Sequence, residues 1–149
     1  VVHGWRQDNH SFSAKKGVMR GLHFQAPPQA QAKLLRVTRG SILDVAVDIR
    51  RGSPTFGRHV AVELSATNWR QLYAPVGMAH GFCTLEADTE VLYKTSEEYA
   101  PETEGGLNWL DPELAIAWPV GAADATVNAR DQAWPNLSGL SSPFLYTGG

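Results

Sequence analysis

A guanidinium and an imidazole lie close together in the segment Arg20-Gly21-Leu22-His23-Phe24-Gln25. If this segment is a β-strand, Leu22 and Phe24 share one face and His23 lies on the other, because side chains alternate along a strand. We expect the apolar pair to pack into a core and His23 to project into the space that the opposite face encloses. A histidine in such a place acts as a base, as a metal ligand or as a hydrogen-bonded core residue.

Acid–base chemistry without a metal needs a base, a group that orients it, an acid and a cation for developing negative charge. The chain offers His23 as base, Asp131 or Asp44 as its orienting partner, Tyr93 as acid and Lys33 as cation. Each of these residues alone has a simpler explanation. A buried histidine or tyrosine is commonly part of the core, and a lysine or aspartate in a strand commonly faces water.

A metal site is the other chemical use of the same histidine. Barrels of the cupin superfamily often hold a metal with a His-x-His pair and a glutamate on one strand and a further histidine on a later one. Pro75-x-Gly77-x-x-His80 resembles the second of these motifs, but Gln25 stands where the first motif would have its second histidine. Two imidazoles are fewer than the three or four protein ligands of a first-row metal, so we expect no metal.

Short alternating segments separated by glycine and proline predict the elements that position these residues. We expect strands at 17–25, at 42–49, at 59–64, at 71–74, at 81–85 and at 90–99, with a further strand between 33 and the Arg39-Gly40 break. Residues 1–16 predict irregular structure with local side-chain hydrogen bonds, and consecutive prolines predict a loop at 26–31. In 42–49 the apolar residues share one face, and Asp44, Ala46 and Asp48 the other, which is typical of a half-buried strand.

The tail from Pro101 shows little periodicity, and a short helical turn is expected around Asp111, with Pro112 at its first position. Almost no other helical pattern occurs. The sequence therefore predicts an all-β fold, a sandwich or barrel of jelly-roll type with a short irregular or helical C-terminal segment.

The composition is that of a globular protein, with 149 residues, 43% hydrophobic and 19% charged residues, and a net charge of −2. This length predicts one domain over 1–149, and the charge gives no reason to expect nucleic acid or a membrane surface as a partner. A lone Cys83 favours a reducing compartment such as the cytoplasm. No apolar run approaches the ~20 residues of a membrane helix. Because the chain begins with Val1, we expect it to be part of a longer gene product.

Many short motifs resemble the dTDP-4-dehydrorhamnose 3,5-epimerase family, in one order and at matching spacing from about Gln7 to Pro135. They are QDNHS (7–11), RGLHFQ (20–25), DVAVDIR (44–50), SPTFG (53–57), RQL (70–72), AHGF (79–82), LYK (92–94) and NARD (128–131). The resemblance implies a cupin-type jelly roll, a homodimer, no metal and no organic cofactor. It implies a dTDP-sugar substrate, dTDP-4-dehydro-6-deoxy-D-glucose, which is inverted at C3 and C5.

The resemblance also implies roles for individual residues. His23 matches the base, Tyr93 the acid, Asp131 the aspartate that orients the histidine and Lys33 the lysine near the C4 oxygen. Tyr99 falls where an aromatic ring stacks on thymine. The residues that fall where the family contacts sugar, diphosphate or nucleoside are Gln7, Asn9, Arg20, His80, Glu104 and Arg130.

The chain departs from the family pattern in two places. Family members carry further residues before the motif at 7–11, including an arginine and a glutamate that help to bind the nucleotide, so we expect this chain to lack that N-terminal segment. Glu98 stands before Tyr99 where the family often has a second aromatic residue. Three other functions stay open: epimerisation of a single carbon of a related nucleotide 4-keto-deoxysugar, sugar-nucleotide binding without catalysis, and metal-dependent cupin chemistry.

Overall fold

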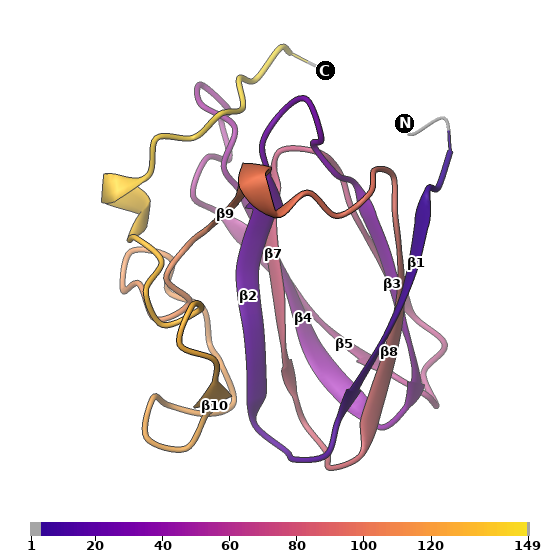
Figure 1. Ribbon diagram of the computed structural model, residues 1–149. Coiled ribbons are helices and arrows are strands. Elements are labelled where there is room, and N and C mark those ends of the chain that lie inside the picture. The colour runs from indigo at the N-terminus through magenta and orange to yellow at the C-terminus, as the bar shows by residue number, and fades with distance from the viewer. Residues whose placement is uncertain (1–3, 149) are drawn as a thin grey trace.

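Two β-sheets enclose the interior of the protein in the computed structural model, which describes residues 4–148 (Figure 1). The first sheet has the strand order β1 (Gln7–Ser13), β8 (Thr89–Thr95), β3 (Lys33–Arg39) and β6 (Gln71–Ala74). The second has the order β10 (Thr126–Val127), β2 (Val18–Gln25), β7 (Met78–Thr84), β4 (Ser41–Asp48) and β5 (His59–Ser65), and β9 (Glu104–Gly106) also pairs with β2. Two short 3-10 turns, η1 (Pro101–Thr103) and η2 (Leu137–Gly139), are the helical elements of the described chain. The predicted all-β jelly-roll class is confirmed.

The chain after β9 covers the outer face of the second sheet, where Figure 1 shows it in orange and yellow outside β2. Its apolar residues pack against the outward face of that sheet in one core cluster. Leu22 and Phe24 belong to this cluster, as the alternation in β2 predicts. A second cluster lies between the sheets, around Leu35, Ile42 and Phe82. The rest of the space between the sheets is polar, and it holds the site described below.

The prediction that 42–49 is half buried is wrong. Asp44 is completely buried and Asp48 nearly so, and on the other face of β4 Val45 and Val47 are buried and Leu43 is partly buried. The C-terminal segment covers one face of β4, and the first sheet lies over the other. A covering segment that is distant in sequence leaves no local signal in the strand itself.

The prediction of irregular structure at 1–16 is also wrong for 7–13, and residues 1–3 lie outside the described residues. This stretch forms β1, an edge strand that pairs along its whole length with β8, from Gln7 opposite Thr95 to Ser13 opposite Thr89. Its inward side chains are polar because they face the polar part of the interior. The usual apolar–polar alternation is therefore missing, although the backbone is a regular strand.

Two smaller corrections concern the later elements. The strand expected at 90–99 ends at Thr95, so 97–100 lies outside the ladder. Around Asp111 the chain makes a single turn without becoming a helix, and the Asp111 carboxylate accepts a hydrogen bond from the Glu113 N–H at 3.0 Å as a cap would. The other strand predictions are confirmed to within a few residues. Among residues 4–148, no helix is long and apolar enough to cross a membrane.

Candidate active site

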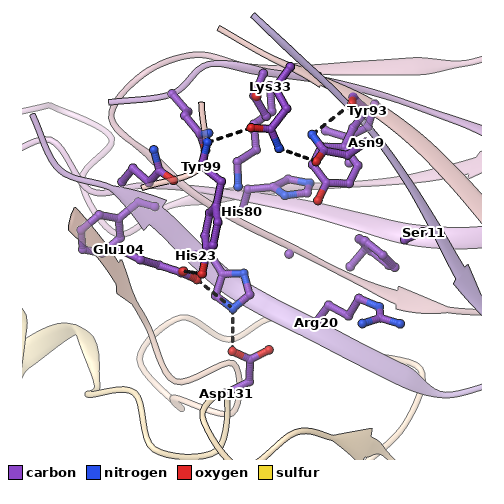
Figure 2. Close-up of a pocket in the computed structure, with 18 of the residues that line it drawn as sticks. Asn9, Ser11, Arg20, His23, Lys33, His80, Tyr93, Tyr99, Glu104 and Asp131 are labelled. Atoms are coloured by element: carbon purple, nitrogen blue, oxygen red, sulfur yellow. Dashed lines mark hydrogen bonds and ion pairs between the residues drawn. The ribbon is translucent and has the colours of Figure 1, made fainter. Parts of the chain in front are cut away.

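A cavity of about 370 Å³ opens between the two sheets (Figure 2). It is lined by every residue to which the family resemblance gives a role in catalysis or substrate binding. Those residues are Gln7, Asn9, Arg20, His23, Lys33, His80, Tyr93, Tyr99, Glu104, Arg130 and Asp131. They come from β1, β2, β3, β7, β8, β9, the stretch after β8 and the segment after β10, so one site accounts for the motifs at 7–11, 20–25, 79–82, 92–94 and 128–131.

The irregular pairing of β2 with β7 lets Arg20 and His23 line the same cavity. Strict alternation would put residues three apart on opposite faces of a strand. The register shifts between these two residues, at Gly21. A Cβ on Gly21 would come within 2.7 Å of the Gly81 Cα, so only glycine allows β2 and β7 to approach so closely.

Asp131 is the partner of His23. The His23 Nε2 lies 2.5 Å from Asp131 Oδ1, and the Gly21 N–H and the Trp134 indole N–H also donate to this carboxylate, at 3.0 Å each. Burial raises the pKa of Asp131, but the hydrogen bonds from these groups outweigh it and hold the pKa at about 2. Asp131 is therefore an anion that fixes the orientation of the His23 ring and stabilises its protonated form.

Asp44, the alternative partner of His23, pairs with His80 instead. The His80 Nε2 lies 2.6 Å from Asp44 Oδ1, and both side chains are buried. His80 stands directly opposite His23 on the neighbouring strand. The site therefore contains two histidine–carboxylate pairs side by side, and Asp44 serves the second of them.

Tyr93 and Lys33 enter the cavity from the first sheet, on the wall opposite His23 and Asp131 (Figure 2). Burial raises the pKa of Tyr93, partly offset by the positive charge of Arg20, so the phenol is a proton donor at neutral pH. Burial lowers the pKa of Lys33, and the negative charges of Glu104 and Asp44 oppose that change. The simpler explanation of Lys33 as a water-facing strand residue does not hold.

Tyr99, Glu104 and Arg130 form a hydrogen-bonded cluster beside His23. The Tyr99 hydroxyl donates to Glu104 Oε2 at 2.7 Å, and the Arg130 guanidinium donates to both the hydroxyl and the carboxylate. Glu104 Oε1 lies 3.9 Å from His23 Nε2. Tyr99 is half exposed, so its ring is available to a ligand that enters the cavity.

Arg20 and Ser11 leave hydrogen-bonding capacity unused at another part of the cavity. One guanidinium nitrogen of Arg20 donates to the Ser13 hydroxyl and the Phe12 carbonyl. Arg20 Nε and Ser11 Oγ are buried without a partner among the described residues. Buried polar atoms are nearly always paired in native proteins, so this part of the cavity is suited to an oxygen-rich ligand.

The described residues contain no group of three or more histidine, cysteine, aspartate or glutamate side chains arranged to hold a metal ion. The two imidazoles of the site each bind a carboxylate through Nε2. Metal independence stays a prediction.

Five further polar residues line the cavity without having been assigned to the site from the sequence: Ser11, Gln25, Gln31, Thr95 and Asn128. Ser11 follows Gln7 and Asn9 at the two-residue spacing of a strand, so recognising β1 would have found it. Asn128 donates to Asp131 Oδ2 at 3.2 Å and accepts from the Asp131 N–H, a local turn that the Asn-x-x-Asp spacing allows. Gln25 is part of the RGLHFQ motif (20–25) but received no role from it, and Gln31 and Thr95 gave no signal in the sequence.

The arrangement can remove a proton from a carbon and return one from the opposite direction. His23, a candidate base, lies on one wall, the Tyr93 phenol lies on the other, and the Lys33 ammonium can stabilise negative charge on an oxygen of a molecule that enters the cavity. Such an arrangement is suited to proton abstraction next to a carbonyl group, followed by reprotonation.

Comparisons with known proteins agree with this chemistry. The family model for dTDP-4-dehydrorhamnose 3,5-epimerase matches residues 1–139. The dTDP-4-dehydrorhamnose 3,5-epimerase of Sinorhizobium fredii is 49% identical over 143 residues, which is 96% of this chain and 73% of the relative. That of Pseudomonas aeruginosa is 58% identical over 114 residues, 76% of this chain. The chain thus spans only 62% of the length of the Pseudomonas relative.

A solved structure is similar over almost the whole chain. It is the dTDP-6-deoxy-D-glucose-3,5-epimerase of Legionella pneumophila in complex with dTDP-4-keto-L-rhamnose. It matches with a TM-score of 0.92 and 45% sequence identity, and the match covers 97% of this chain and 77% of that one. The similarity therefore includes both sheets and the segment that covers the second sheet.

Proposed function

The chain belongs to the dTDP-4-dehydrorhamnose 3,5-epimerase family, and we propose that it inverts C3 and C5 of dTDP-4-dehydro-6-deoxy-D-glucose to give dTDP-4-dehydro-L-rhamnose. One observation carries the proposal. His23 and Tyr93 line one cavity from two different sheets, so a sugar ring between them meets a base on one face and an acid on the other. Inversion at a carbon requires this arrangement, because the proton leaves from one face and returns to the other.

In the proposed reaction, neutral His23 removes the proton from a carbon next to the C4 ketone. The C–H electron pair moves into an enolate whose charge rests on the C4 oxygen, and the Lys33 ammonium stabilises that oxygen. Tyr93 then gives its proton to the other face of the same carbon. Each inversion leaves His23 protonated and Tyr93 deprotonated, and exchange with water resets both.

We propose that the nucleotide part of the substrate binds near the Tyr99–Glu104–Arg130 cluster. The half-exposed Tyr99 ring offers a surface on which thymine can stack. The Arg130 guanidinium lies beside it and can bind diphosphate oxygens through two N–H groups. Arg20, with its unpartnered buried Nε, supplies a second positive charge for the anionic substrate. Gln7, Asn9 and His80 complete the polar contacts.

Three further parts of the proposal come from the family resemblance and from composition. We propose a homodimer, because the family works as one, and sedimentation tests this. We propose that the reaction needs neither metal nor organic cofactor. We also propose a cytoplasmic location, which the buried Cys83 without a disulfide partner supports.

The experiment is incubation of the enzyme with the 4-keto substrate in deuterated water, with NMR of the product. Incorporation of deuterium at both C3 and C5, with inversion at both, is the expected result. Incorporation and inversion at one carbon alone would replace the proposal by the single-carbon epimerase. Binding of substrate with no exchange at either carbon would identify a binding protein without catalytic activity.

A further inference from the structure

The segment that carries Tyr99 is held by glutamine side chains. After Thr95 the chain leaves the β8 ladder, and 97–100 has no strand partner on either side. A loop that presents an aromatic ring to a ligand must be fixed in some other way, because an unfixed ring loses conformational entropy on binding. In this protein the amides of Gln25, Gln31 and Gln7 bind its backbone, and the Thr95 hydroxyl also donates to the Glu97 carbonyl at 2.8 Å.

Gln25 binds the backbone on both sides of Tyr99. Its Nε2 donates to the Glu98 carbonyl at 3.1 Å, and its Oε1 accepts the Ala100 N–H at 2.9 Å. This pair of bonds is what a neighbouring strand would supply to the residues that flank Tyr99. Gln25 is only 3% exposed, and its Nε2 also donates to the Gln29 carbonyl at 2.8 Å.

Two further amides extend the same support. Gln31 Nε2 donates to the Glu97 carbonyl at 2.8 Å, and Gln7 Oε1 accepts the Tyr99 N–H at 2.8 Å. The three glutamines come from β1, from the end of β2 and from the loop before β3, so three separate parts of the chain converge on four residues. Gln7 is already assigned to the substrate, whereas Gln25 and Gln31 have no assigned role.

We propose that Gln25 and Gln31 are positioning residues for nucleotide recognition, acting through the backbone of 97–100 to hold the Tyr99 ring where a base can stack on it. The inference rests on the proposed role of Tyr99. An amide is required at Gln25 because the position both donates and accepts, and a carboxylate of the same size cannot donate.

The test compares Gln25→Glu and Gln31→Ala with the wild type and with the control Gln71→Ala. Gln71 is exposed on β6, away from the cavity. The dissociation constant of dTDP is measured by calorimetry, with KM, kcat and the melting temperature alongside. Gln25→Glu is expected to weaken dTDP binding about tenfold and to raise KM similarly, since stacking on an aromatic side chain is typically worth factors of about 5 to 150 in affinity. The kcat at saturation should change less than about twofold, and Gln71→Ala should match the wild type.

A double-mutant cycle with Tyr99→Ala separates this inference from the proposed function. If Gln25 acts through Tyr99, the double variant binds dTDP no more weakly than Tyr99→Ala alone. Full additivity of the two losses, or unchanged dTDP affinity in Gln25→Glu and Gln31→Ala, overturns the positioning role. Unchanged affinity in Tyr99→Ala instead overturns the proposed stacking role of Tyr99. If Gln25→Glu does not fold, the same measurements on Gln31→Ala test the positioning role.

Discussion

His23 and Tyr93 face one cavity from opposite sheets, His23 from β2 of the second sheet and Tyr93 from β8 of the first. No hydrogen bond joins His23 to Tyr93, and each of the two residues interacts with different neighbours. Asp131 fixes His23, whereas Arg20 is the charge that counteracts the effect of burial on Tyr93. In the proposed reaction, the two half-steps of an inversion therefore depend on two groups that can be replaced one at a time.

Replacement of the base should abolish turnover and leave nucleotide binding intact. For His23→Ala we expect kcat to fall by about 10²–10⁴-fold, the usual effect of losing a general base, with dTDP affinity within about twofold of the wild type. His10→Ala, which removes an exposed histidine of β1, is the control. Retention of more than a tenth of the wild-type kcat by His23→Ala would reject His23 as the base.

Replacement of the acid should separate exchange from inversion. In Tyr93→Phe the ring remains, so packing and binding should survive while the proton donor is lost. In deuterated water the variant should still exchange substrate protons, because the proposed base His23 is intact and can form the enolate, but net product should fall far more than exchange does. Equal losses of exchange and product would show that Tyr93 is not a separate donor. Tyr73→Phe, on the exposed outer side of the first sheet, is the control.

Removal of the cation should raise the barrier to enolate formation. For Lys33→Met we expect kcat to fall by about 10²–10³-fold, the range found when one donor to a developing oxyanion is removed. Because the charge is needed only as the enolate forms, deuterium exchange should fall together with product. Loss of product with normal exchange would assign Lys33 to the second half-step instead. Lys94→Met, which removes an exposed lysine, is the control and should leave kcat and deuterium exchange unchanged.

The dependence of the free energy of unfolding on pH in the acid range should depend on Asp131. The folded-state pKa of about 2 lies below the ordinary value of 3.8, so the unfolded chain binds the proton more readily. The resulting stabilisation, roughly 2 kcal/mol, is fully present above about pH 5 and is lost as pH falls from about 4 toward 2. Urea unfolding of the wild type and Asp131→Asn should therefore show a larger difference at pH 7 than at pH 3. An equal difference at both pH values contradicts the assignment.

Chelation should have no effect on the rate. Dialysis against EDTA, followed by assay in metal-free buffer, is expected to leave kcat and KM unchanged, because His23 and His80 each bind a carboxylate through Nε2. Reversible loss of activity, restored by one divalent metal, would instead favour the metal-dependent cupin reaction. Metal analysis of protein purified without chelator gives an independent measurement.

Most of the site could be predicted from the sequence, because the residue types and the two-residue alternation of a strand do not depend on the surrounding structure. Alternation in β2 puts Leu22 and Phe24 in the core and His23 in the interior, and the motifs match a family residue by residue. The same alternation failed in β1, where most side chains on both faces are polar and the one apolar residue, Phe12, is exposed. Alternation also predicted the wrong burial for Asp44. The face of β4 that carries Asp44 is covered by the other sheet, and the local sequence of β4 does not describe that sheet.

Only the tertiary structure decided which carboxylate serves which histidine. Asp131 is 108 residues away from His23 in the chain, and Asp44 is 36 residues away from His80, so neither spacing reveals the pairing. The sequence left Asp131 and Asp44 as equal candidates from the residues alone. Contacts at this separation depend on how the two sheets and the C-terminal segment pack, which no local pattern encodes. The hydrogen bonds from three glutamines to 97–100 could not be predicted for the same reason. A side-chain amide that takes the place of a neighbouring strand produces no periodic pattern in the sequence.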